Sequence, residues 1–167
     1  MKLLKTIRFD ASDERVFELA AAPEEWAVSG AFAFADLAPE TIAGKARQAF
    51  ANGFLGVASF GRSTFATVAE ATPADLEGIE GSLALHFVTA HGAPGLEAAL
   101  PAAKEEARFV LDLCRNAPIN TVFTVRRTRD TQGRIKEEFR TIRPPTASMT
   151  LDGLISAWMI GGRWLWR

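Results

Sequence analysis

Cysteine and histidine are scarce in this chain, which contains one cysteine and two histidines among 167 residues. A single cysteine excludes a disulfide framework and any zinc or iron–sulfur centre that needs several cysteines. Two histidines leave few groups for metal binding or acid–base catalysis. We therefore expect neither a metal site nor a cofactor.

Long apolar runs are also missing. No stretch approaches about 18 consecutive apolar residues, the length that suggests a membrane-spanning helix. Lys2, Lys5 and Arg8 lie near the N-terminus, but no unbroken apolar stretch follows them, so this segment does not resemble a secretory signal. The sequence thus predicts a cytoplasmic protein without a membrane span.

Motifs of the common enzyme classes are absent as well. The chain contains no G-x-S-x-G, no Rossmann glycine pattern and no H-E-x-x-H. The neighbouring acids Glu24-Glu25 and Glu105-Glu106 would diverge around any helix, whereas catalysis by paired carboxylates needs converging groups. We expect no catalytic residue on this basis.

What is present is typical of a folded domain, with 48% hydrophobic and 23% charged residues. The charge is unevenly distributed. Residues 1–112 contain nine basic and sixteen acidic side chains, whereas residues 113–167 contain ten basic and four acidic ones. A basic C-terminal third can attract an anionic partner or pair with the acidic body of another copy. The simpler interpretation is a solvated hairpin that is rich in arginine.

Apolar residues recur every three or four positions in two segments, a spacing typical of amphipathic helices. The first segment follows Thr72-Pro73, a capping residue and a proline, and covers residues 73–91. The second covers residues 96–116. An alternative makes residues 82–89 a strand, because apolar residues also alternate there. We favour two helices that form an αα-hairpin.

Short segments rich in Leu, Ile, Val and Phe predict strands. We expect strands over residues 3–9, 31–36, 54–60, 63–71, 119–129 and 134–143, and short helices over residues 13–20 and 45–50. The last two strands flank the turn at residues 130–133, where Gly133 can adopt a positive φ. These elements predict an α+β fold: a mainly antiparallel sheet of about five strands, with the helical hairpin packed on one face.

The C-terminal residues differ from the rest. We expect an α+β domain over residues 1–145, ended by Pro144-Pro145, and a tryptophan-rich extension over residues 146–167. The extension contains Trp158, Trp164 and Trp166, and apolar residues spaced by three or four before Gly161-Gly162 predict a helix. It can fold back over the sheet, dock on a partner or lie at a membrane surface, and it can also be a non-native extension.

The two histidines and the cysteine each have a simple structural interpretation. His86 and His91 are five positions apart, which places them about 140° apart on a helix, whereas a metal-binding pair needs three or four. His91 lies in the last helical turn, where it favours the negative end of the helix dipole. Cys114 belongs to the apolar stripe of its helix, so we expect a buried and unreactive thiol.

Two groups of basic residues indicate candidate anion sites. The segment Gly61-Arg62-Ser63-Thr64 combines a cation with hydroxyl groups, although it is not a P-loop and can be a plain turn. Arginines and a lysine also gather on the C-terminal hairpin: Arg126, Arg127, Arg129, Arg134, Lys136, Arg140 and Arg143. RNA-binding sheets combine such charges with exposed aromatics, but here the core needs the aromatics, and acids that would form cross-strand pairs are interleaved. Nucleic-acid binding is therefore disfavoured.

Several strings resemble a small family of uncharacterised proteobacterial proteins, a domain of unknown function. They are Gly44-Lys45-Ala46-Arg47-Gln48-Ala49-Phe50, Asn52-Gly53-Phe54-Leu55-Gly56, Ser59-Phe60-Gly61-Arg62-Ser63-Thr64-Phe65, His86-Phe87, Gly92-Ala93-Pro94 and Phe139-Arg140-Thr141. The resemblance covers roughly residues 3–143 and has no counterpart for the tail. It implies a bacterial protein and transfers no activity, ligand or catalytic residue.

The leading hypothesis is a non-enzymatic accessory or assembly protein that acts through protein contacts, as a homo-oligomer, with an interface at Trp158, Trp164 and Trp166. The alternative is a small-anion-binding protein or an unrecognised enzyme that uses Arg62, Ser63, His86 and Arg126 together with other arginines of the hairpin. A third hypothesis is RNA binding through the basic hairpin.

Overall fold

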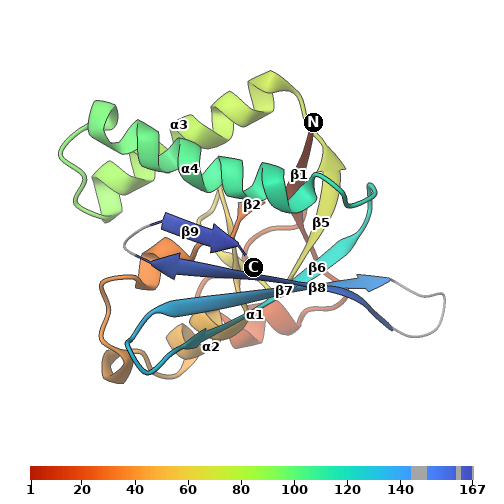
Figure 1. Cartoon of the computed structure of the whole chain (residues 1–167), viewed down its shortest axis with the longest axis horizontal. Helices are drawn as coiled ribbons and strands as arrows, with labels where there is room; N and C mark the ends of the chain where they lie inside the picture. The colour runs from red at the N-terminus through yellow and green to blue at the C-terminus, as the bar shows by residue number, and fades with distance from the viewer. Residues whose placement is uncertain (144–149, 161–162, 167) are drawn as a thin grey trace.

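A computed structural model describes residues 1–143, 150–160 and 163–166 of the chain (Figure 1). One sheet of nine strands runs through it in the order β4-β3-β2-β1-β5-β6-β7-β8-β9, and it curls like half of a barrel. Every neighbouring pair is antiparallel. The strands are β1 (Lys2–Ile7), β2 (Trp26–Val28), β3 (Phe54–Gly56), β4 (Arg62–Ser63), β5 (Phe65–Glu70), β6 (Val122–Arg129), β7 (Ile135–Arg143), β8 (Thr150–Ile160) and β9 (Arg163–Trp166).

Two long helices, α3 (Pro73–Ala90) and α4 (Leu96–Cys114), lie side by side along one face of this sheet (Figure 1). Thr72 and Asp75 form a reciprocal capping box at the start of α3, and the chain turns away at Gly92, whose φ is +75°. The helical interpretation of residues 82–89 is therefore confirmed and the strand alternative is wrong. The α+β class, with its antiparallel sheet and packed helical hairpin, is confirmed with it.

The core fills the space between the helices and the sheet. Its largest fully buried apolar side chains include Leu83 of α3, Val110 of α4, and Phe123 and Phe139 of the hairpin. Cys114 is completely buried in the same cluster, and burial raises the pKa of its thiol to about 12. The prediction of a buried cysteine is confirmed by this 0% exposure. A thiol with the raised pKa remains protonated near neutral pH and is therefore a poor nucleophile.

The strand expected over residues 31–36 is wrong. Residues Ala31–Phe34 form a short 3₁₀ helix, η1, which begins after Gly30 at a φ of +79°. The alternating phenylalanines have separate environments: Phe32 packs against Phe87, with ring centroids 4.8 Å apart, and Phe34 against Phe50, at 5.4 Å. A second 3₁₀ turn, η2 (Pro39–Thr41), leads into α2 (Lys45–Asn52), while α1 (Ser12–Val16) ends earlier than expected.

The helix expected in the C-terminal extension is also wrong. Residues Thr150–Ile160 form β8, which pairs along β7, so the sheet extends beyond the five or so strands expected. The register shifts between Thr141, opposite Gly153, and Ile142, opposite Leu151. Such a bulge adds a residue to one strand and interrupts the alternation of period two. Leu154, Ile155, Trp158 and Met159 all follow this bulge, so their helix-like spacing lies within the regular part of β8.

Parts of the expected tail lie outside the described residues, namely the Pro144-Pro145 stop and Gly161-Gly162. The same applies to the side chains of Trp158, Trp164 and Trp166, although their backbones lie in β8 and β9. Within the described ranges, no helix is long and apolar enough to cross a membrane.

Candidate functional site

A buried ion pair lies where the β6–β7 hairpin meets the N-terminal half of the sheet. The Nε atom of Arg127 donates to Oε1 of Glu137 at 2.6 Å, and both side chains are 0% exposed. The two residues face each other across β6 and β7, as the interleaved charges predicted. The hydroxyl of Ser29 also donates to Glu137. Burial raises the pKa of Glu137, and the Arg127 guanidinium opposes this rise.

The remaining nitrogens of Arg127 bind carbonyls of two backbone segments. Its Nη1 atom donates to the carbonyls of Gly53 at 2.8 Å and Phe50 at 2.9 Å, at the C-terminal end of α2, and Nη2 donates to the carbonyl of Ser29. The last carbonyls of a helix lack partners within the helix and carry partial negative charge. The guanidinium therefore anchors α2 to the sheet.

Arg62 is a second buried cation in this region. Its side chain donates to the carbonyls of Gly53 and Gly30, each at 3.2 Å, and its guanidinium lies over the ring of Phe34 at 4.9 Å. Burial, together with the positive charge of Arg127, lowers the pKa of Arg62 to about 9, and Glu137 opposes this shift. Gly30 is required here, because its φ is +79° and a Cβ atom would lie 2.6 Å from the Cβ atom of Leu55.

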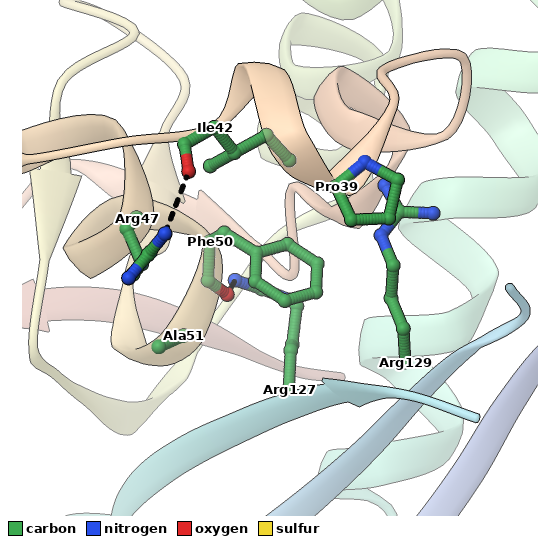
Figure 2. Close-up of a pocket in the computed structure, with 7 residues that line it drawn as sticks. All are labelled: Pro39, Ile42, Arg47, Phe50, Ala51, Arg127 and Arg129. Atoms are coloured by element: carbon green, nitrogen blue, oxygen red, sulfur yellow. Dashed lines mark hydrogen bonds between the residues drawn. The ribbon is translucent and has the colours of Figure 1, made fainter. Parts of the chain in front are cut away.

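Next to this network lies an open pocket with a cavity volume of about 370 Å³ (Figure 2). We call it the arginine pocket. It is lined by Pro39, Ile42, Arg47, Phe50, Ala51, Arg127 and Arg129. Helix α2 and the turn before it contribute the first five residues, and β6 contributes the last two. A cavity of this size falls in the range of small-molecule sites.

The three arginines of the arginine pocket differ in how many of their N–H donors already make hydrogen bonds. Arg127 is saturated by the contacts above. Arg129 donates to the carbonyls of Phe34 at 2.7 Å, Leu37 at 2.9 Å and Gly133 at 3.1 Å, and within the described ranges its buried Nε–H has no hydrogen-bond partner. Arg47 is exposed and makes one long bond, 3.4 Å, to the carbonyl of Ile42. Among the described residues no carboxylate pairs with Arg47 or Arg129, so the pocket is electropositive.

The carboxylate of Glu25 organises the turn that follows β3. Its Oε1 atom accepts from the backbone N–H groups of Ser59 at 2.7 Å and Ala58 at 3.1 Å, and its Oε2 atom accepts from the Ser59 hydroxyl at 2.7 Å. Oε2 also accepts from the N–H of Ala22 at 2.5 Å. This buried carboxylate fixes the turn that presents Phe60, whose φ is +57°.

The spacing of the two histidines predicted that they lie on different sides of the helix, and this prediction is wrong. Their Nε2 atoms lie 3.3 Å from each other. His91 is the residue that ends α3, with φ −125° and ψ 15°, so it no longer follows the helical rotation that the prediction assumed. The ring of Phe60 stacks on His86 with centroids 3.8 Å apart.

The other residues singled out from the sequence are dispersed. Ser63 is buried, and its hydroxyl donates to the carbonyl of Phe65 at 2.8 Å. Arg126 is exposed on β6 and pairs in register with Glu138, so it does not line the arginine pocket. Arg62 lies behind the pocket, bound to the same Gly53 carbonyl as Arg127. Thus Arg127 and Arg129 of the hairpin reach the pocket, and Ser63, His86 and Arg126 do not.

These features define an α+β domain. It combines a curled antiparallel sheet with a helical hairpin and an arginine pocket. The chain belongs to the family of unknown function DUF6505, which it matches over residues 1–155. The match extends beyond the segment of roughly residues 3–143 that showed the resemblance, and it includes part of β8. Comparison with curated proteins found no match, and comparison with solved structures found none either.

Proposed function

We propose that this protein binds a small anion with an apolar portion in the arginine pocket. The observation that carries the proposal is the combination of apolar walls with two cations, Arg47 and Arg129, that have no carboxylate partner among the described residues. The guanidinium of Arg47 is exposed and retains free N–H donors, which suits a carboxylate or a phosphate. The anion would also lie in the field of Arg129, whose unpaired Nε–H adds to the positive potential.

The walls account for the apolar portion of the ligand. Phe50 is partly exposed and lies over Arg129, with the guanidinium carbon 5.5 Å from the ring centroid. Pro39, Ile42 and Ala51 complete an apolar surface beside the cations. An inorganic anion alone would leave this surface in contact with water, so a ligand with an aromatic or aliphatic body should bind more tightly.

Calorimetric titration with benzoate and with its neutral analogue benzamide tests this proposal. Benzoate should bind and benzamide should bind at least about tenfold more weakly, because a hydrogen bond to a charged group contributes about 1.5–3 kcal/mol. Arg47→Gln should weaken benzoate binding by a similar factor. Arg129→Lys, which retains the charge but removes the planar fork, should have a smaller effect.

Arg126→Gln is the matched control, since Arg126 lies on the same strand but is exposed away from the arginine pocket. It should leave benzoate affinity unchanged. Equal affinity for benzoate and benzamide, or equal losses in Arg47→Gln and Arg126→Gln, would refute an anion site in this pocket.

We also propose a second candidate function, an accessory role in which two copies of the chain join through β9. This strand ends the sheet order and pairs, among the described residues, with β8 alone. A backbone edge of this kind can accept another strand. The tryptophans at positions 164 and 166 lie on β9, where large aromatic side chains would favour an interface.

Light scattering after size-exclusion chromatography tests the self-association. The full chain should elute with the mass of a dimer. A chain that lacks residues 163–167 should elute as a monomer, because the strand that joins the two copies is gone. This shorter chain should remain folded, because β8 remains paired with β7. A monomeric full chain, or dimers of both chains, would contradict an interface at β9.

A further inference from the structure

The two histidines of this chain form a pair that the anion pocket does not use. His86 lies in the last turns of α3 and His91 ends this helix, and the ring centroids are 4.9 Å apart at 71°. The Nε2 atoms face each other at 3.3 Å. His86 is partly exposed and His91 is exposed, so a solute can reach the pair.

Aromatic contacts hold both imidazoles in this arrangement. Phe60 stacks on His86 with an interplanar angle of 5°, and the edge of Phe32 packs against His91 with centroids 5.3 Å apart. Phe60 has a φ of +57°, a conformation that is unfavourable for a bulky side chain. The hydrogen bonds of Glu25 to the preceding residues, Ala58 and Ser59, stabilise the turn that holds this conformation. The pair is therefore preorganised by residues from three segments of the chain.

The surroundings also favour the neutral form of both rings. Partial burial lowers the pKa of His86, and the charges of His91 and Arg62 lower it further. Burial and Arg62 lower the pKa of His91 as well, while Asp36 opposes them. Neutral imidazole is the form that coordinates a metal, because its second nitrogen carries a free lone pair.

The distance between the two nitrogens suits a metal ion shared by both rings as well as a direct hydrogen bond, since 3.3 Å is within hydrogen-bond reach when one ring donates and the other accepts. Two imidazole nitrogens bound to one tetrahedral metal at about 2.0–2.1 Å are about 3.3–3.4 Å apart. The observed 3.3 Å matches the edge of such a coordination tetrahedron.

We propose that His86 and His91 bind a divalent transition-metal ion, with Zn²⁺ or Cu²⁺ as the chemical class that imidazole ligands favour. The described part of the chain contains no cluster of three or more metal-ligating side chains, so water fills the other coordination positions. The positive charge of Arg62 opposes the bound cation and limits its affinity, whereas Asp36 favours it. The site does not depend on the proposed anion binding.

The composition of the chain makes the test specific, since an untagged protein contains no other histidine and its one cysteine is buried. Calorimetric titration of the untagged full chain with ZnCl₂ and with CuCl₂ should show one equivalent bound. The imidazole signals of both histidines should shift in NMR spectra. His86→Phe, which retains a ring against Phe60, and His91→Asn, which suits the helix end, should each weaken binding by at least about tenfold.

Glu77→Gln is the control, because this exposed carboxylate lies on the same helix, away from the histidines in sequence. It should leave the affinity unchanged, and thermal unfolding of every variant in EDTA should confirm that the fold persists. Absence of binding by the unmodified chain, or equal binding by a His86→Phe/His91→Asn variant, would overturn the proposal. In that event the 3.3 Å contact is a hydrogen bond between two neutral rings.

Discussion

Replacing Arg127 with methionine is expected to lower the free energy of unfolding by about 3–5 kcal/mol. The change leaves the Glu137 carboxylate buried without its 2.6 Å partner. It also removes the guanidinium donor from the carbonyls of Ser29 and Phe50, while the Gly53 carbonyl keeps its bond from Arg62. A buried polar group that loses its hydrogen bond retains its full desolvation cost, and this explains the large effect.

Urea denaturation followed by circular dichroism measures this loss. Arg126→Met is the matched control, since it removes the neighbouring exposed arginine from the same strand, and it should change the free energy of unfolding by less than about 0.5 kcal/mol. The double variant Arg127→Met/Glu137→Met should be more stable than the sum of its single variants implies, by about 0.5–3 kcal/mol, because the unpaired charge is gone. A loss below about 1 kcal/mol in Arg127→Met would contradict a structural role for the ion pair.

Glu25→Ala is expected to destabilise the fold by at least about 3 kcal/mol. The carboxylate accepts hydrogen bonds from three backbone N–H groups and one hydroxyl, and hydrogen bonds to charged groups contribute about 1.5–3 kcal/mol each without being additive. Loss of this anchor should also release Phe60 from His86, which NMR detects as a change in the aromatic ring-current shift of the imidazole.

Glu24→Asn provides the comparison for Glu25→Ala. Glu24 is exposed and has a φ of +65°, which asparagine tolerates. This variant removes the adjacent carboxylate and should leave both the stability and the His86 signal nearly unchanged. If the two variants were equally destabilised, the effect would belong to the loop conformation and not to the Glu25 hydrogen bonds.

The hairpin arginines show why the candidate site could be predicted only in part. Arg126 and Arg127 are adjacent and chemically identical, so composition cannot separate them. Alternation along β6 does, because Arg127 lies two and four positions after the buried Val125 and Phe123. The alternation that marks Arg127 as buried was therefore present in the sequence. However, burial of a charged residue on the apolar face of a strand is expected only when the partner of its charge is known.

The residues from the N-terminal half were less accessible to prediction. Arg47 and Arg129 meet across a pocket although they are far apart in the chain, and the α2 helix reaches β6 through Arg127. The histidines illustrate the same limit at short range. Helical geometry places them apart, whereas the conformation of His91 after the last helical residue brings their nitrogens together.

The sequence by itself determined the α+β class, the two long helices, the hairpin turn and the burial of Cys114. Those features follow from local spacing and capping, which act within a few residues. Only the tertiary structure decided that β8 extends the sheet, that Arg127 is buried beside Glu137, and that the arginine pocket and the histidine pair exist. Each of these depends on contacts between distant segments or on the backbone conformation at a helix end, so local patterns such as the alternation along β6 could indicate them only in part.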